Sequence, residues 1–342
     1  MMRNRMIDNI LSQPLSLTEA CAWQFGDGAP ALAAAASVLR GARRIVFTGM
    51  GTSLFAALPA TCFLQARGIS AEAVDSSELL HFLHPSIRPG DAVVVVSRSG
   101  ESAEVVKLLP LLGERGLPVV GLTNFADSTL AHRSTHALAM KCRADRMVAV
   151  QSYTSSLTVL ILLAASVMNV PLDPWRAAIE KMVPELEVEI RRQIEAKDEW
   201  TSFLSDAEVV YLLGRGPSLA SCHEGALLFH ESCRLPAIGM STGQFRHGVV
   251  EVVDRRTRAI VFASQNGTEE LDLALAEDLR SMGAQVRVCR GHAPAPGLET
   301  ILEIVPMQVA ACYLAQAKGW EPGDFRHSTL VTDTEVGFRH SS

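Results

Sequence analysis

Short apolar runs, each followed by a turn and then by a helix-like stretch, recur along this 342-residue chain. Residues 44–48 form one such run and lead into the turn Gly49-Met50-Gly51-Thr52-Ser53-Leu54. Residues 92–96 are one alanine and four valines, and they lead into Ser97-Arg98-Ser99-Gly100-Glu101-Ser102. Apolar runs without alternation predict strands that are buried on both faces, as in a parallel sheet that is covered by helices.

The same order of elements returns in the second half of the chain. The turn pattern G-x-G-x-S-L reappears at 214–219, which is 165 residues after its first copy. The run at 259–263 leads into Ser264-Gln265-Asn266-Gly267-Thr268, at an offset of 167, and the next run, 285–288, keeps that offset from 118–121. Three strand–turn–helix units in each half predict an α/β protein with two tandem, doubly wound, flavodoxin-like parallel sheets that arose by duplication.

Changes in composition predict five segments. They are an N-terminal segment (1–25), a first domain (26–170), a helical connection (171–199), a second domain (200–320) and a C-terminal tail (321–342). The most apolar stretch, 157–170, is shorter than the roughly 20 residues that span a bilayer, so it predicts a buried helix rather than a membrane anchor.

Charge and cysteine content narrow the classes of partner. A net charge of −6 and no concentrated run of Lys or Arg argue against a nucleic-acid partner. The seven cysteines are scattered without metal-ligand spacing, which favours a reduced, cytoplasmic protein without a metal or cofactor. The basic start leads to no apolar core of signal-peptide length. An anionic ligand must therefore be held by amides and hydroxyls.

The loop 97–102 is the strongest candidate site. In open α/β sheets ligands bind at the carboxyl ends of the strands, so the turn at 49–53 and this loop should share one edge. Ser97, Ser99 and Ser102 offer hydroxyls, and Gly100 lets the backbone approach a ligand. The following helix offers free N–H groups with a partial positive charge, which favours a phosphate.

Two features qualify this hypothesis. Thr52 and Ser53 add hydroxyls at the other helix start, although Ser and Thr are also ordinary helix N-caps. In the second half, Glu269 and Glu270 follow the corresponding loop and would compete with a phosphate for the same amides. We therefore expect only the first half to bind phosphate.

Gly51-Thr52-Ser53 and the S-x-S-G-E-S loop in a duplicated α/β chain resemble the sugar-isomerase (SIS) family. The layout is similar to the isomerase half of glucosamine-6-phosphate synthase and to amino-sugar-phosphate deaminases and fructosamine-6-phosphate deglycases. The resemblance implies that Glu231 moves a proton between C1 and C2 of the sugar. It also implies that His247, in an H-G sequence, opens the sugar ring from the partner subunit of a homodimer. A carboxylate and an imidazole suit such proton transfers.

The chain departs from the family pattern where relatives carry lysines. The tail, 321–342, resembles the tail that closes over the sugar in that family, but it has Thr329 and Leu330 where a lysine can form a Schiff base. Gln151 and Leu228 stand at two other lysine positions. The candidates for compensating positive contacts are Arg98, Arg246, Arg326 and His327.

Two functions remain open from the sequence. One is an enzyme that acts on a hexose 6-phosphate derivative, by isomerisation or by deamination or deglycation. The other is a non-catalytic phosphosugar sensor. Outside the family pattern, Glu231 would be a solvated helix residue and His247 a structural loop histidine. Glu224, seven residues before Glu231, is on nearly the same helix face and could cap or brace the site.

Overall fold

The computed structural model describes residues 5–145, 148–264, 267–293, 295–327, 329 and 331–337. The chain forms two compact units. We call the unit made of Leu15–Ala144, Gln151–Glu180 and Phe325–Ser342 the N-sheet unit. The other, made of Met1–Pro14, Asp145–Val150 and Lys181–Asp324, is the C-sheet unit.

The N-sheet unit is built on a five-stranded parallel sheet with the order β2-β1-β3-β4-β5. The order reverses at β1, so the helix between β1 and β2 lies on one face of the sheet and the helices between β2 and β5 lie on the other. Its strands are β1 (Arg44–Gly49), β2 (Ala71–Asp75), β3 (Asp91–Val96), β4 (Val119–Thr123) and β5 (His136–Ala139). All of β3 is buried, as expected for a central strand with helices on both faces.

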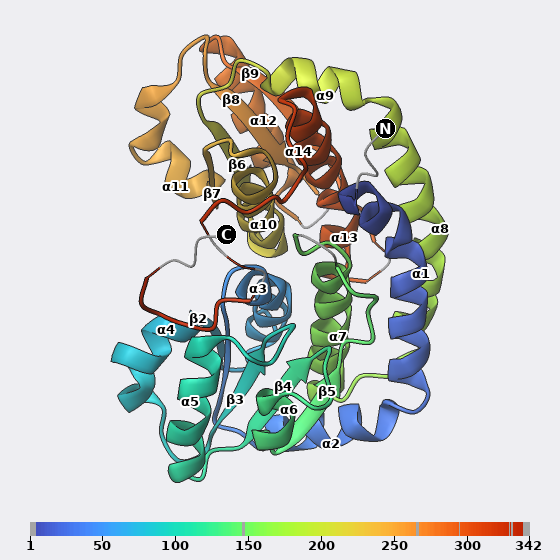
Figure 1. The fold of residues 1–342 in the computed structure, drawn as a ribbon, viewed down its shortest axis with the longest axis vertical. Coiled ribbons are helices and arrows are strands. Elements are labelled where there is room, and N and C mark those ends of the chain that lie inside the picture. The colour runs from blue at the N-terminus through green and yellow to red at the C-terminus, as the bar shows by residue number, and fades with distance from the viewer. Residues whose placement is uncertain are drawn as a thin grey trace. The chain divides into compact units, whose positions relative to one another are not determined.

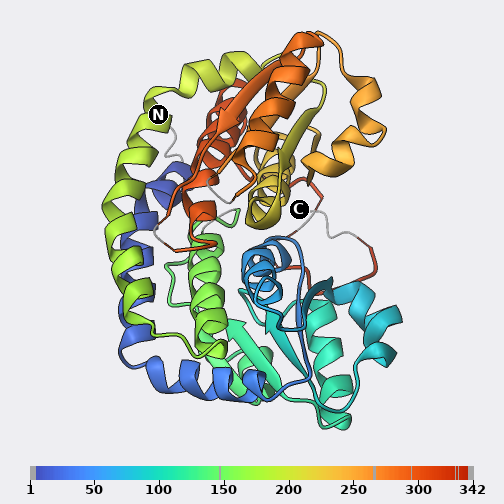
Figure 2. The same cartoon turned by 180° about the vertical axis from the view of Figure 1, so that it is seen from behind.

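Helices cover both faces of this sheet (Figures 1 and 2). One layer consists of α2 (Ala29–Arg40), α3 (Thr52–Gln65) and α7 (Gln151–Val167). The other consists of α4 (Ser76–Glu78), η1 (Leu79–Leu83), η2 (His84–Ser86), α5 (Ala103–Glu114) and α6 (Thr129–Arg133). Helix α7 is buried along nearly its whole length, which confirms the prediction of a buried helix at the most apolar stretch.

The C-sheet unit has a four-stranded parallel sheet with the order β7-β6-β8-β9. Its strands are β6 (Val210–Gly214), β7 (Ala237–Ser241), β8 (Arg258–Phe262) and β9 (Gln285–Cys289). Its helical elements are α9 (Lys197–Leu204), η3 (Gly216–Ser218), α10 (Leu219–Leu228), η4 (Phe229–Cys233), α11 (Thr242–Arg246), η5 (Val249–Val252), α12 (Glu269–Ser281), α13 (Glu299–Glu303) and α14 (Val305–Ala317). The two parallel sheets confirm the predicted fold class.

The faces of the second sheet are distinguished by alternate residues of β6. Tyr211 and Leu213 pack with Phe245 of α11 and with α12. A side chain at Gly225 of α10 would meet Leu212, which points to the other face. Helices α10 and α11 therefore lie on opposite faces of this sheet.

Strand pairing corrects one predicted offset between the two halves. Thr48 pairs with Val95 in the first sheet, whereas Leu213, 165 residues after Thr48, pairs with Val261. The offset at β8 is therefore 166 rather than 167, and Ser97 corresponds to Ala263. Because side chains alternate between faces, this one-residue difference matters: Ser264 takes the place of Arg98, not of Ser97.

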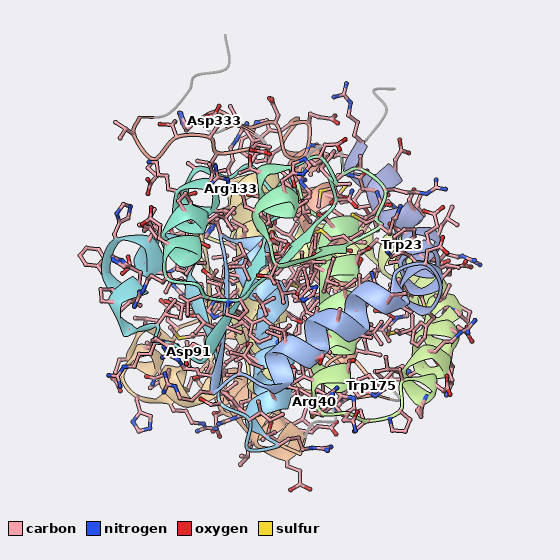
Figure 3. All side chains as sticks on the ribbon, turned by 90° about the horizontal axis from the view of Figure 1, so that it is seen from below. Trp23, Arg40, Asp91, Arg133, Trp175 and Asp333 are labelled. Atoms are coloured by element: carbon pink, nitrogen blue, oxygen red, sulfur yellow. The ribbon has the colours of Figure 1, made fainter. Side chains whose placement is uncertain are left out.

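The described part of the predicted N-terminal segment and most of the predicted connection are helical. Helix α1 (Arg5–Phe25) and helix α8 (Asp173–Glu195) each contribute residues to both compact units. Within the N-sheet unit, Trp175 of α8 packs against Phe63 of α3 with ring centroids 5.2 Å apart, and Figure 3 labels Trp175 among the side chains. The predicted domain boundaries remain predictions.

One stretch of the described residues, Glu299–Ala317, is apolar and long enough to cross a membrane by length and composition alone. It consists of α13 and α14, and 83% of it is buried within the structure. A buried core helix passes the same test of length and hydropathy, and the burial of this stretch is typical of such a helix.

Candidate functional site

The glycine turn after β1 and the serine loop after β3 lie next to each other. Strands β1 and β3 are parallel neighbours, so their carboxyl ends share one edge of the sheet. A Cβ atom on Gly49 would stand 2.9 Å from the carbonyl oxygen of Val96, which shows how closely the two segments approach. The hydroxyls of both segments are therefore placed at one edge.

The glycine turn leads directly into α3. Gly51 is the N-cap residue, with a φ of +50°, and its helix has no side-chain capping bond among the described residues. Thr52 and Ser53 are the first two helical residues and are half-buried. They occupy the first turn rather than the N-cap position, so the alternative interpretation of these residues as N-caps is wrong.

The serine loop folds back on itself through its own hydroxyls. The Ser97 Oγ atom lies 3.3 Å from Ser102 Oγ and accepts a hydrogen bond of 3.1 Å from the Gly100 N–H. Ser99 Oγ accepts a bond of 3.2 Å from the Glu101 N–H. Ser97 is buried, whereas Ser99 and Ser102 are half-buried. The loop thus gathers three hydroxyls around one tight turn.

Gly100 makes this turn possible. Its φ is +69°, a value that side-chain-bearing residues rarely adopt. A Cβ atom at this position would lie 2.5 Å from Ser128 Cβ. Glycine is therefore required both by the backbone conformation and by the space available.

The next strand braces the loop from outside. The Arg98 carbonyl accepts hydrogen bonds from Thr123 Oγ1 at 3.1 Å and from the Asn124 N–H at 3.0 Å. The Glu101 carboxylate turns towards the start of α6, where it accepts from the Thr129 N–H at 2.5 Å and from Thr129 Oγ1 at 2.9 Å. The acidic residue of the loop is thus engaged at another helix N-terminus.

Two helices begin at this edge of the first sheet without a side-chain cap, whereas α2, which also lacks a side-chain cap, begins before β1. They are α3 and α5, and in the described residues neither Gly51 nor Ser102 supplies a capping bond. By contrast, Asp75 caps α4 and Ser128 caps α6. First-turn N–H groups with the positive end of the helix dipole suit an anion such as phosphate.

The C-terminal tail contacts the start of α5. The Ala103 N–H donates a 3.0 Å hydrogen bond to the Thr332 carbonyl. Further along the tail, Glu335 forms ion pairs with His81, at 2.6 Å, and with Lys107. Lys107 and His81 lower the pKa of Glu335 below its ordinary value. The sequence did not single out Lys107 or Glu335. Of the tail residues discussed above, Leu330 lies outside the described residues and Thr329 is exposed.

Glu231 lies in the C-sheet unit, in the π-helical turn η4 that ends α10. Its side chain is half-buried, and the preceding His230 accepts a 3.0 Å hydrogen bond from the Ala237 N–H through Nε2. The last lysine of the chain, Lys318, donates to the Cys233 carbonyl at 3.3 Å, two residues from Glu231. Single π-helical turns often occur at functional sites.

His247 follows α11 and is exposed. Because α10 and α11 lie on opposite faces of the sheet, Glu231 and His247 of one chain are carried on different faces. The structure therefore does not bring Glu231 and His247 of one chain together on the same face of the second sheet.

The residues considered as substitutes for the missing lysines differ in their surroundings. Arg246 forms an exposed ion pair of 2.8 Å with Asp278, and Arg326 and His327 are exposed in the tail. Arg98 is half-buried in the serine loop itself. Leu228 and Gln151, at two of the lysine positions, are buried. Over the part of the chain that the structure describes, no group of three or more His, Cys, Asp or Glu residues is placed to hold a metal ion.

Comparison with known proteins identifies the family of this chain. The SIS domain model matches residues 38–168 and 203–289, more than half of the chain. Glutamine–fructose-6-phosphate aminotransferase [isomerizing] 1 of Arabidopsis thaliana is 28% identical over 306 residues, which is 82% of this chain and 45% of that protein. The chain spans about half the length of the curated relatives that it matches.

Two solved structures share the fold. A protein of Silicibacter pomeroyi DSS-3, provisionally named a phosphosugar isomerase, has a TM-score of 0.78 at 25% identity, covering 93% of this chain and 99% of its own. Glucosamine-6-phosphate deaminase of Thermotoga maritima also has a TM-score of 0.78, at 20% identity, covering 96% and 99%. With its two parallel sheets and the matching family model, the chain belongs to the SIS domain family.

Proposed function

We propose that the chain is an enzyme of sugar-phosphate metabolism that acts on a hexose 6-phosphate derivative, as an isomerase or as an amino-sugar-phosphate deaminase or deglycase. One observation carries the proposal. At the carboxyl edge of the first sheet, α3 and α5 begin without side-chain caps beside the hydroxyls of the serine loop. The names of the relatives, which include an isomerising aminotransferase and a deaminase, support the same substrate class.

The phosphate is held by the N-sheet unit. Its oxygens accept hydrogen bonds from the hydroxyls of Ser97, Ser99 and Ser102, and Thr52 and Ser53 contribute from the glycine turn. Because Gly51 and Gly100 both have positive φ, backbone can approach the ligand at both segments. Arg98 is the charged residue of the loop. Such a site needs no lysine, since oriented amides and hydroxyls supply the positive end of each dipole.

The carbon chemistry is assigned to Glu231. In isomerisation the Glu231 carboxylate removes the proton from the carbon next to the carbonyl, which leaves an enediolate anion and a protonated Glu231. The same proton returns to the neighbouring carbon while the hydroxyl proton moves between O1 and O2, so atoms and charge balance. His247 protonates the ring oxygen and opens the sugar. His247 acts from the partner subunit of a homodimer, which agrees with its position on the other face of the sheet from Glu231.

The side chains present favour an enediol route over a covalent one. A Schiff base needs a lysine amine at the sugar carbonyl. Leu228 is buried and apolar, and Thr329 carries no amine. Where an amine is already on the sugar, the same proton transfer gives an enamine-like intermediate and then an imine. Water adds to the imine carbon, the C–N bond breaks, and ammonia or the amine leaves behind a carbonyl group. Both reactions use the same carboxylate.

The test is a screen of hexose 6-phosphates and their amine-linked derivatives, read both by thermal stabilisation and by product formation. We expect at least one compound to be bound and converted. Glu231→Gln should lower turnover by roughly 100-fold or more while binding is kept. Glu208→Gln, which removes an exposed carboxylate from the same unit, is the matched control and should leave turnover unchanged.

Other results would lead elsewhere. Binding without conversion of any compound would favour the non-catalytic sensor, for which the absent lysines are the supporting observation. Full turnover by Glu231→Gln would exclude Glu231 as the base. Stabilisation by sugars that lack a phosphate would contradict the assigned role of the serine loop.

A further inference from the structure

A carboxylate is enclosed at the carboxyl edge of the second sheet. Glu303, the last residue of α13, is fully buried. Its two oxygens accept hydrogen bonds from Ser218 Oγ at 2.7 Å, from Ser221 Oγ at 2.6 Å and from Ser264 Oγ at a still shorter distance. Three hydroxyls around one buried carboxyl group form a built site rather than an incidental contact.

The donors come from the counterparts of the phosphate-binding segments. Ser218 is in the glycine turn after β6 and corresponds to Ser53 in the turn after β1, and Ser221 is in the first turn of the following helix. Ser264 is in the loop after β8, the counterpart of the serine loop after β3. Strands β6 and β8 are parallel neighbours, as β1 and β3 are. The carboxylate is therefore held between the same two segments that form the candidate site of the first sheet.

In each sheet a backbone N–H after the next strand, β4 or β9, donates to the loop, although the acceptor differs. In the first sheet the Asn124 N–H, after β4, donates to the Arg98 carbonyl. In the second, the Gly291 N–H, after β9, donates a 2.9 Å bond to Ser264 Oγ. A Cβ atom on Gly291 would lie 2.8 Å from Glu303 Cγ, so glycine at 291 leaves room for the carboxylate.

The N-terminus of α12, which carries the positive end of a helix dipole at this edge, also has an acidic residue of the same chain in its first turn. Asp272, in the first turn of α12, is buried and accepts from Arg215 Nε at 3.1 Å, from Thr242 Oγ1 at 2.9 Å and from Thr268 Oγ1 at 3.2 Å. Glu269 and Glu270 are in the same turn, as the sequence predicted. Internal carboxylates thus occupy the places where an external anion would meet hydroxyls and helix N–H groups.

We propose that the second sheet keeps an anion-binding site, here called a seat, between the segments that correspond to those of the first sheet, and that Glu303 fills it as an internal substitute for a phosphate group. Each chain then has one open seat, formed by the glycine turn and the serine loop, and one closed seat, which Glu303 occupies. Removal of the Glu303 carboxylate makes the second seat available to a tetrahedral oxyanion such as inorganic phosphate or sulfate. The comparison with the first seat rests on the proposed function, but the contacts of Glu303 do not.

The test replaces Glu303 in a chain whose first seat is disabled by Ser97→Ala, Ser99→Ala and Ser102→Ala. Glu303→Ala and Glu303→Ser are refolded in phosphate or in chloride of equal ionic strength, and thermal unfolding is followed. We expect phosphate to raise the midpoint of both variants by several degrees, with little effect on the parent that keeps Glu303. Adding Ser218→Ala should remove most of the phosphate effect, because it deletes one donor.

Each result decides the proposal. Recovery of a variant in phosphate but not in chloride supports it, even where the variant does not fold in chloride. Equal behaviour in the two salts, or failure to fold in both, overturns it. Since the serine loop is disabled in every chain compared, a failure of the proposed phosphate site in the first sheet would leave this readout unchanged. That failure is detected separately with the chain that has intact serines.

Discussion

The backbone N–H of Ala103 donates its hydrogen bond to the carbonyl of Thr332, so a tail residue supplies the backbone cap of helix α5. The helix otherwise begins at Ser102 without a side-chain cap among the described residues. A phosphate at the serine loop would use N–H groups of this same turn. The tail and the ligand therefore compete for one donor, and the ion pairs of Glu335 favour the tail.

Weakening those ion pairs should strengthen phosphate binding. Lys107→Met keeps most of the aliphatic chain and removes the charge that Glu335 contacts. We expect the affinity for inorganic phosphate, measured by calorimetry, to rise a few-fold in roughly 50 mM salt and to rise less in high salt, because exposed pairs are screened. Lys181→Met, an exposed lysine elsewhere, is the control. A lower affinity would mean that the tail contributes to binding instead.

Ser99→Ala tests the serine loop directly. The hydroxyl is half-buried and its loss removes one donor to a charged ligand, which is worth about 1.5–3 kcal/mol. We expect the dissociation constant for the sugar phosphate to rise about 10- to 100-fold, with a smaller change in the turnover of bound substrate. Ser37→Ala, on the exposed side of α2, should leave the dissociation constant unchanged. An unaltered constant for Ser99→Ala would place the phosphate elsewhere.

Gly100→Ala should destabilise the fold as well as the site. The added methyl meets Ser128, whose hydroxyl caps α6, and the backbone has a φ of +69°. We expect a loss of about 2–4 kcal/mol in the free energy of unfolding, measured with urea. Gly116→Ala is the matched control, because its φ is +66° but nothing lies within 4 Å of the added atom. That control should lose only about 1 kcal/mol. Equal losses for the two variants would show that the contact with Ser128 costs nothing.

Glu299 gives the stability a defined dependence on pH. Burial raises the pKa of Glu299 from 4.5 to about 7, and the nearby Glu303 adds to the shift. The folded chain therefore holds this proton more tightly than the unfolded chain does. Its contribution to stability is full below about pH 4.5 and is lost as the pH rises through about 7.

Glu299→Gln should remove that part of the pH dependence. At pH 8 the variant should be more stable than the parent by an amount on the order of 3 kcal/mol, and near pH 4 the two should be similar. Chemical unfolding at a series of pH values measures this difference. Glu270→Gln, which changes an exposed carboxylate, should follow the parent curve. A parent stability that stays flat between pH 5 and 8 would contradict the raised pKa of Glu299.

The fold was predictable because its signals are local. A run such as 92–96 has no alternation of polar and apolar residues, which indicates a strand that is buried on both faces, and β3 is such a strand. The glycine turn and the serine loop could be placed at one edge from strand order alone. The offset at β8 was wrong because matching letters aligned Ser264 with Ser97, whereas the pairing of β8 with β6 is shifted by one residue.

The contacts of Glu303 and of the tail could not be predicted, because their partners are distant in sequence. Ser218 and Ser264 are separated from Glu303 by 85 and 39 residues. In the sequence, Glu299 and Glu303 are two acids four residues apart in an apolar stretch, a pattern equally typical of a solvated helix edge. Only their burial distinguishes the two interpretations.

The carboxylate of Glu303 also has a consequence for how the two sheets respond to metabolism. A seat that is filled by a diffusible metabolite is stabilised only while that metabolite is present, in proportion to the logarithm of its concentration. A seat that is filled by a side chain of the same protein, as Glu303 fills the second one, does not depend on the concentration of any metabolite. In the proposed arrangement, a fall in the concentration of the sugar phosphate would lower the stability of the N-sheet unit but not that of the C-sheet unit. The resistance of the N-sheet unit to proteolysis would then depend on the level of the sugar phosphate.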